Sequence, residues 1–139
     1  EEGPPAYIWS ALDVLRVERT DHGVQATRDA ILVQRLVRTK MPLTVCPLSN
    51  LQLRVVPSLA RHNLGQLLAS GIVATVNSDD PAYFGGYINE NFTQTFAALG
   101  LGAQQAWQLA ANSLDASFVD SRVRGDLQHR LDGFFETFR

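Results

Sequence analysis

Short apolar segments alternate with amphipathic helical segments along this 139-residue chain, and this alternation restricts its fold more than any other feature. Residues 43–46 and 72–76 are rich in β-branched residues and almost continuously apolar, as is typical of parallel strands covered on both faces. Residues 17–20 form a weaker third candidate. Helical periodicity is expected over residues 7–15, 28–39, 59–70, 88–99, 103–114 and 121–138. Strands and helices that alternate in this way predict an α/β fold with a parallel sheet.

A sheet of three parallel strands leaves two open edges, whereas a complete (β/α)₈ TIM barrel normally requires about 250 residues. We therefore predict a partial TIM barrel, with about three strands, their helices and trailing helices, and with residues 1–139 belonging to one domain. A small flavodoxin-like sheet is the alternative, because periodicity does not separate the two. The sequence has no initiator Met, so we expect a processed or truncated chain.

Charge and cysteine content exclude several classes of protein. The formal net charge is -2, and the Lys and Arg residues are spread along the chain, so there is no basic stripe for a nucleic acid. No apolar run approaches the roughly 20 residues that span a bilayer. The single cysteine, Cys46, excludes an internal disulfide and favours a reducing compartment. We expect a cytoplasmic protein with a small-molecule ligand and without nucleic acid or membrane partners.

Reactive side chains follow the end of each proposed strand, which in a barrel is the catalytic face. His22 follows the first strand and is either a general base, a metal ligand or a capped loop residue. Asp79 and Asp80 follow the third strand. They are either a turn with a helix cap, or a metal ligand beside a group that binds a substrate proton. Glu1 would stand at the end of a preceding strand.

Three further residues are assigned no catalytic role, and the role of a fourth, Asn50, is left open. Cys46 is expected to be a small buried apolar residue, since no Cys-His arrangement is evident. His62 and His129 are expected to be exposed on helices, without a second ligand at suitable spacing. Asn50 either orients a substrate or forms a turn.

Four motifs, in order and in register with the strand ends, resemble the second half of the adenosine/adenine deaminases. They are residues 1–5 (Glu-Glu-Gly-Pro-Pro), 18–23 (Glu-Arg-Thr-Asp-His-Gly), 45–50 (Val-Cys-Pro-Leu-Ser-Asn) and 76–87, which begin Val-Asn-Ser-Asp-Asp-Pro. The resemblance covers nearly the whole chain. The loops at residues 46–56 and 83–87 look closer to the adenine deaminase branch.

This resemblance implies the C-terminal half of a TIM barrel that holds one zinc ion through three histidines and one aspartate. Asp79 matches the metal-ligand aspartate, and Asp80 matches the residue that hydrogen-bonds a ring nitrogen of the purine. His22 matches the histidine that polarises and deprotonates the zinc-activated water, and Glu1 matches the acid that protonates the purine ring. The family's three histidine ligands precede Glu1 and are absent from this chain.

The implied reaction is zinc-dependent hydrolytic deamination of adenine to hypoxanthine and ammonia. Adenosine and an N6-substituted adenine are alternative substrates. Because three zinc ligands are absent, we expect this chain alone to be inactive and to require the missing N-terminal half of the barrel. A non-catalytic, metal-free fragment with a purine-binding surface and an unrelated small α/β binding domain are the other hypotheses. A homo-oligomer is left open.

Overall fold

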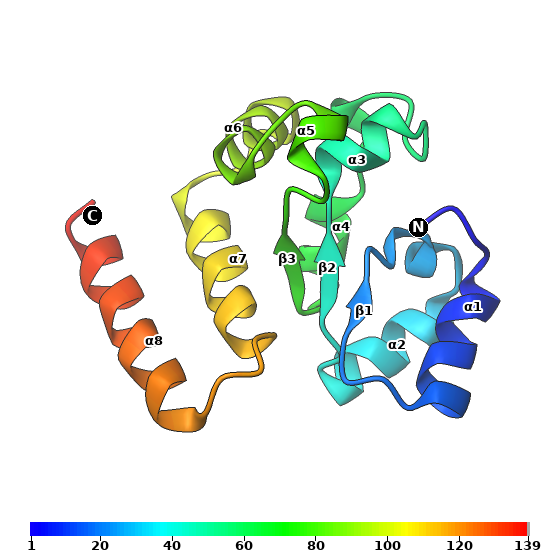
Figure 1. Cartoon of the computed structure of the whole chain (residues 1–139), viewed down its shortest axis with the longest axis horizontal. Helices are drawn as coiled ribbons and strands as arrows, with labels where there is room; N and C mark the ends of the chain where they lie inside the picture. Colours follow the sequence, from blue (N-terminus) through cyan, green and yellow to red (C-terminus); the bar gives the residue numbers. More distant parts are fainter. Residues whose placement is uncertain (139) are drawn as a thin grey trace.

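The computed structural model describes residues 1–138 and shows three parallel strands surrounded by helices (Figure 1). The strands lie side by side in the order of the sequence: β1 (Thr20–Asp21), β2 (Leu43–Val45) and β3 (Ala74–Val76). A flavodoxin-like sheet would instead place the first strand between the second and the third. The observed order is that of neighbouring strands in a barrel, so it favours the partial barrel over the alternative.

Helical segments connect the strands and extend beyond the sheet. They are α1 (Pro5–Ser10), continued by the π-helical η1 (Ala11–Leu15), then η2 (Val24–Arg28), α2 (Ala30–Thr39), α3 (Pro47–Gln52), η3 (Leu59–Arg61), α4 (Leu64–Ala69), α5 (Pro81–Phe84), α6 (Ile88–Leu99), α7 (Ala103–Asp115) and α8 (Ser121–Glu136). Within residues 1–138, no helix combines the length and the apolar character needed to cross a bilayer.

The apolar core lies between the sheet and the two crossover helices α2 and α4. Leu36 of α2, Leu43 of β2 and Leu64 of α4 are fully buried and belong to one apolar cluster. Helix α2 begins after Asp29, whose carboxylate accepts hydrogen bonds from the backbone N–H groups of the first turn. Trp9 also donates to this carboxylate, over 2.9 Å, and so ties η1 and α1 to the start of α2.

The chain after β3 returns to this strand through α7. Helix α7 packs against β3, and Asn112 donates a hydrogen bond to the backbone carbonyl of Ala74 over 2.7 Å. Beyond α7, the Arg19 guanidinium donates to the carbonyl of Ala116 and lies 4.5 Å from the centre of the Phe118 ring. These contacts join the two outer strands of the sheet, which are far apart in sequence, through the segment that follows α7.

The observed elements differ from the sequence prediction mainly at their ends. The first strand lies at Thr20–Asp21 rather than over residues 17–20. The helix predicted over residues 59–70 is wrong as a single element, because it is interrupted after Arg61 and resumes at Leu64. The loops predicted after β2 and β3 contain short helices, each of which begins at a proline. A proline fits the first turn of a helix because it needs no N–H partner there.

Candidate functional site

The His22 ring lies between two carboxylates, those of Glu1 and Asp79. Its Nδ1 atom is 3.4 Å from Glu1 Oε2, and its Nε2 atom is 3.8 Å from Asp79 Oδ2. Neither pair is aligned as a hydrogen bond, and Nδ1 is buried without a hydrogen-bond partner among residues 1–138. The three side chains that were predicted to be the acid, the base and the metal ligand therefore lie together at one end of the sheet.

Two residues of this group adopt the left-handed backbone conformation. His22 has φ = 59° at the end of β1, and Asp79 has φ = 59° shortly after β3. The backbone N–H of His22 still donates to the carbonyl of Thr44, so the turn begins directly where strand pairing stops. The next residue, Gly23, lies so close to Leu43 that a Cβ atom would be 2.7 Å from its side chain. This crowding, together with the positive φ of Gly23 itself, requires glycine at position 23.

A hollow of about 340 Å³ opens in front of this group, on the sheet face away from α2 and α4. Its lining consists of Arg19, Asp21, His22, Thr44, Cys46, Asn77 and Asp79. Successive side chains of a strand point to opposite faces, so Thr44 faces away from the core residues Leu43 and Val45. Thr44 donates a hydrogen bond to Asp21 over 2.8 Å. One face of the sheet is thus apolar, and the other is polar and open.

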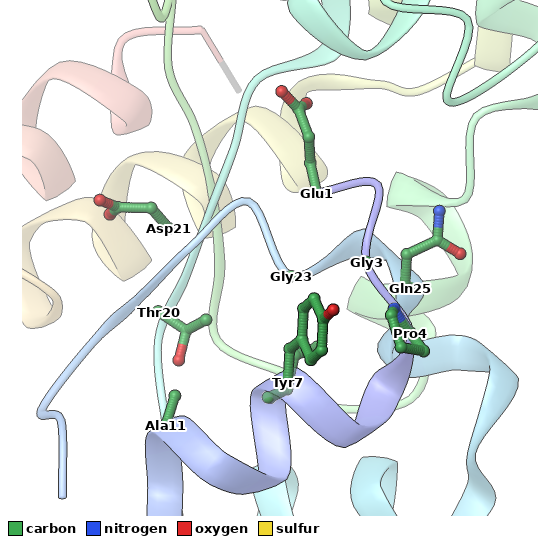
Figure 2. A pocket seen from close by; sticks show the side chains of 10 residues that line it. Glu1, Gly3, Pro4, Tyr7, Ala11, Thr20, Asp21, Gly23 and Gln25 are labelled. Atoms are coloured by element: carbon green, nitrogen blue, oxygen red, sulfur yellow. The ribbon is translucent and has the colours of Figure 1, made fainter. Parts of the chain in front are cut away.

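A second pocket, of about 140 Å³, lies beside the free edge of β1 (Figure 2). Glu1 and Asp21 stand on its rim, and Tyr7 of α1 lies below them. The hydroxyl of Thr20 is buried here without a hydrogen-bond partner among the described residues. Asp21 lines both pockets, so the two hollows adjoin at β1.

Cys46 is buried, as predicted, but it lies beside the candidate metal ligand. Its Sγ atom, a His22 ring nitrogen and an Asp79 oxygen lie within 4.8 Å of one another. Burial raises the pKa of the Cys46 thiol to about 12, and the negative charges of Asp79, Glu1 and Asp21 add to this effect. The thiol is therefore neutral at neutral pH, which supports the prediction that Cys46 is not a nucleophile.

Asp80 follows Asp79 but makes different contacts. Its carboxylate accepts a hydrogen bond from the backbone N–H of Tyr83 over 3.0 Å and caps α5. Its own backbone N–H donates to Asp79 Oδ1 over 2.9 Å, which links the two aspartates. The predicted purine contact of Asp80 stays a prediction, since the structure explains this side chain as a helix cap.

The prediction for His62 is wrong, because its side chain is buried rather than exposed on a helix. It has 4% of its surface exposed and lies in the break between η3 and α4. Burial lowers its pKa to about 4. Its Nε2 atom lies 3.0 Å from Oδ1 of the fully buried Asn50, which in turn donates through Nδ2 to Glu1 Oε2.

This connection could not be predicted from the sequence, because its members are distant along the chain. His62 and Asn50 contact each other across 12 positions, and Asn50 reaches Glu1 across 49. Asn63, a residue type preferred before helices, is the local signal that could have indicated a break after His62. His129, by contrast, is exposed on α8 as predicted.

Known proteins match this chain over nearly its whole length, including the residues of the site. The adenosine deaminase family model matches residues 1–134. An adenine deaminase of Albidiferax ferrireducens is 72% identical over 99% of this chain, and one of Trichlorobacter lovleyi is 61% identical over 98%. The matches cover 40% and 39% of those two proteins, so this chain spans about two fifths of their length.

Solved structures agree in fold. The crystal structure of adenine deaminase from Arthrobacter aurescens matches 97% of this chain and 41% of its own, with a TM-score of 0.95 and 48% identity. An amidohydrolase from Burkholderia ambifaria, crystallised with bound zinc, matches 96% of this chain and 38% of its own, with a TM-score of 0.88 and 24% identity. The three strands and their helices are part of a (β/α)₈ barrel, and the chain belongs to the adenosine deaminase family.

Proposed function

We propose that this chain is the C-terminal part of the barrel of a zinc-dependent adenine deaminase, which converts adenine to hypoxanthine and ammonia. Similar proteins at 72% and 61% identity are named adenine deaminases, and each is more than twice as long as the matched segment. Strands β1 and β3 each have one free edge within the described residues. The remaining strands of the barrel would pair with these edges.

The position of His22 between Glu1 and Asp79 is the observation that carries this proposal. Hydrolytic deamination needs a base for the attacking water and an acid for the purine ring nitrogen beside the amine-bearing carbon. His22 would take the proton from water, and Glu1 would protonate the ring nitrogen. The water oxygen bonds to the carbon, and the carbon–nitrogen bond then breaks as His22 passes its proton to the departing amine, which leaves as ammonia. The proton of the new hydroxyl returns to Glu1, so hypoxanthine forms and both side chains regain their starting protonation states. The two groups are 3.4 Å apart, which suits successive proton transfers at one substrate.

The Asp79 carboxylate is an oxygen ligand of a kind that zinc accepts, and it lies 3.8 Å from the His22 ring nitrogen, which stays free to act as the base. The neighbouring Cys46 thiol is neutral and would not bind the ion. Asp79 would hold the ion from this chain, with three histidines supplied by the preceding part of the enzyme. Zinc, when bound, supplies activation of water at neutral pH. Asp80, directly after the ligand, would accept a hydrogen bond from a purine ring N–H.

The full-length enzyme that contains this chain tests the proposal. We expect it to hold about one zinc per subunit by elemental analysis, and to release ammonia from adenine faster than from adenosine or an N6-substituted adenine. A faster reaction with either alternative would reassign the substrate. A folded, zinc-loaded enzyme that releases ammonia from none of the three would instead favour the non-catalytic hypothesis.

Two further expectations accompany this proposal. We expect the enzyme to be cytoplasmic, because the single cysteine of this chain, Cys46, favours a reducing compartment. We also expect residues 1–139 to fold as part of one barrel domain, so the chain expressed alone should show no deaminase activity.

A further inference from the structure

We propose that Asn50 and His62 are positioning residues that orient the carboxylate of Glu1 through a chain of hydrogen bonds. This inference rests on the proposed function, in which Glu1 is the acid. The chain runs from the backbone N–H of Leu64 to His62, from His62 to Asn50, and from Asn50 to Glu1. It begins at the helix α4 and ends at the site.

The backbone of α4 determines which nitrogen of His62 carries the proton. The N–H of Leu64 lies 3.0 Å from His62 Nδ1, and a backbone N–H can only donate. Nδ1 must therefore be the unprotonated acceptor, which leaves the hydrogen of the neutral ring on Nε2. The pKa of His62 is lowered by burial to about 4, so the ring is neutral at neutral pH and keeps this arrangement.

His62 in turn determines the orientation of the Asn50 amide. The protonated Nε2 faces Oδ1 of Asn50 over 3.0 Å, so the amide oxygen is the group that accepts there. The NH₂ group of Asn50 must then point the other way, toward Oε2 of Glu1. A flipped amide would place its oxygen against a carboxylate oxygen and would leave both acceptors without a donor.

The backbone around Asn50 makes this orientation rigid. Asn50 is fully buried, its N–H donates to the carbonyl of Cys46 over 2.9 Å, and its own carbonyl accepts from Val55 and Val56. Its side chain therefore has little freedom to follow a moving carboxylate. The geometry of Glu1 is imposed by Asn50 and not the reverse.

The two carboxylate oxygens of Glu1 therefore have different surroundings. Among the described residues, both polar contacts to this carboxylate, from Asn50 and His22, fall on Oε2. A proton on Oε2 would compete with the N–H donor of Asn50, so the proton to be transferred is placed on Oε1. Asn50 and His62 thereby select the oxygen that faces the purine ring without touching the purine themselves.

Steady-state kinetics of the zinc-loaded, full-length enzyme test this role. His62→Phe keeps a ring but removes the donor, and we expect kcat for adenine to fall about 10–100-fold, with KM changed less than about 2-fold. His62→Gln can restore an N–H donor toward Asn50 and should recover most of kcat. His129→Phe, on the exposed face of α8, should leave both constants unchanged.

Asn63→Ala is the matched control for a general loosening of this segment. Asn63 is next to His62 and donates to the carbonyl of Val24 over 2.7 Å, but it has no contact with Asn50 or Glu1 among the hydrogen bonds of residues 1–138. We expect it to lower stability while leaving kcat within about 2-fold of the parent enzyme. If Asn63→Ala lost as much kcat as His62→Phe, the proposal would be overturned. A rise in KM with unchanged kcat in His62→Phe would overturn it as well.

The tautomer of His62 tests the chain of hydrogen bonds independently of any turnover. Long-range proton–nitrogen NMR of histidine-labelled enzyme, with the His62 signals assigned by their loss in His62→Gln, should show a neutral ring with its hydrogen on Nε2 at pH 7. A hydrogen on Nδ1 would contradict the proposal. An enzyme without adenine deaminase activity would refute the proposed function, while this measurement would still decide whether the connection exists.

Discussion

Leu36, Leu43 and Leu64, on the helix-covered side of the sheet, are fully buried within one apolar cluster. On the opposite side of the sheet, His22 and Asp79, which follow the ends of β1 and β3, line a hollow of about 340 Å³. Truncation of a side chain on the first side leaves a cavity, whereas the second side is only partly enclosed by the described residues. We infer that the apolar face determines stability and that the polar face determines activity. Substitutions on each side test whether the two effects are separate.

The largest expected effect is on the polar face. Glu1→Gln keeps the shape of the side chain but removes the acid, so we expect kcat of the full-length enzyme to fall about 10²–10⁴-fold. The free energy of unfolding in urea should change by less than about 1 kcal/mol, because the amide oxygen of Gln can still accept the hydrogen bond from Asn50. Glu2→Gln, at the exposed neighbouring position, is the matched control and should leave kcat unchanged. A large loss of stability in Glu1→Gln would show that the two faces are not separate.

On the apolar face, Leu36→Ala should lower the free energy of unfolding by about 2–5 kcal/mol, because a fully buried side chain leaves a cavity. Its kcat per folded molecule should stay near that of the parent enzyme. Ile31→Ala, on the same helix at 69% exposure, should cost less than about 0.5 kcal/mol. Equal losses in the two variants, measured by urea unfolding, would contradict the packing of α2.

His62 lies where the two faces meet, and its burial predicts a pH effect on stability. Its pKa falls from 6.5 to about 4 on folding, so the unfolded chain binds more protons between these values. Its contribution to stability is complete above about pH 6.5 and is lost as the pH falls toward 4, by roughly 3 kcal/mol. Urea unfolding at pH 7, 5.5 and 4.5 should show this loss, and His62→Gln should lack it. Parallel pH profiles for both proteins would mean that His62 is not buried.

The smallest expected effect comes from Thr44→Val on the open face. This change removes the hydroxyl that donates to Asp21 over 2.8 Å. Water can replace the lost donor because the pair is exposed, so unfolding should change by less than about 1 kcal/mol. Thermal unfolding at one pH is sufficient to measure it. A cost above 2 kcal/mol would show that the polar face also stabilises the sheet.

The features that could be predicted from sequence are those that repeat locally. The strands are short, nearly continuous apolar runs, the amphipathic helices have a period of 3.6 residues, and parallel strands bring their ends together. These facts place Glu1, His22 and Asp79 at one edge. The connection through Asn50 and His62 could not be predicted, because it depends on a helix break and on contacts between residues up to 49 positions apart. The cap that Asp80 forms on α5 is local, since its carboxylate accepts from the N–H of Tyr83 three positions later, and a helix cap was one of the two predictions for this residue.

The positive φ angles of His22 and Asp79 also limit which amino acids can replace them. Most side chains are disfavoured in the left-handed region, whereas Asn, Asp, His and Gly are tolerated. Alanine at either position would change the backbone energy together with the chemistry, so its effect would mix two causes. His22→Asn and Asp79→Asn isolate the chemistry better. Any redesign of this pocket is therefore restricted to a few amino acids at positions 22 and 79, whatever the substrate requires.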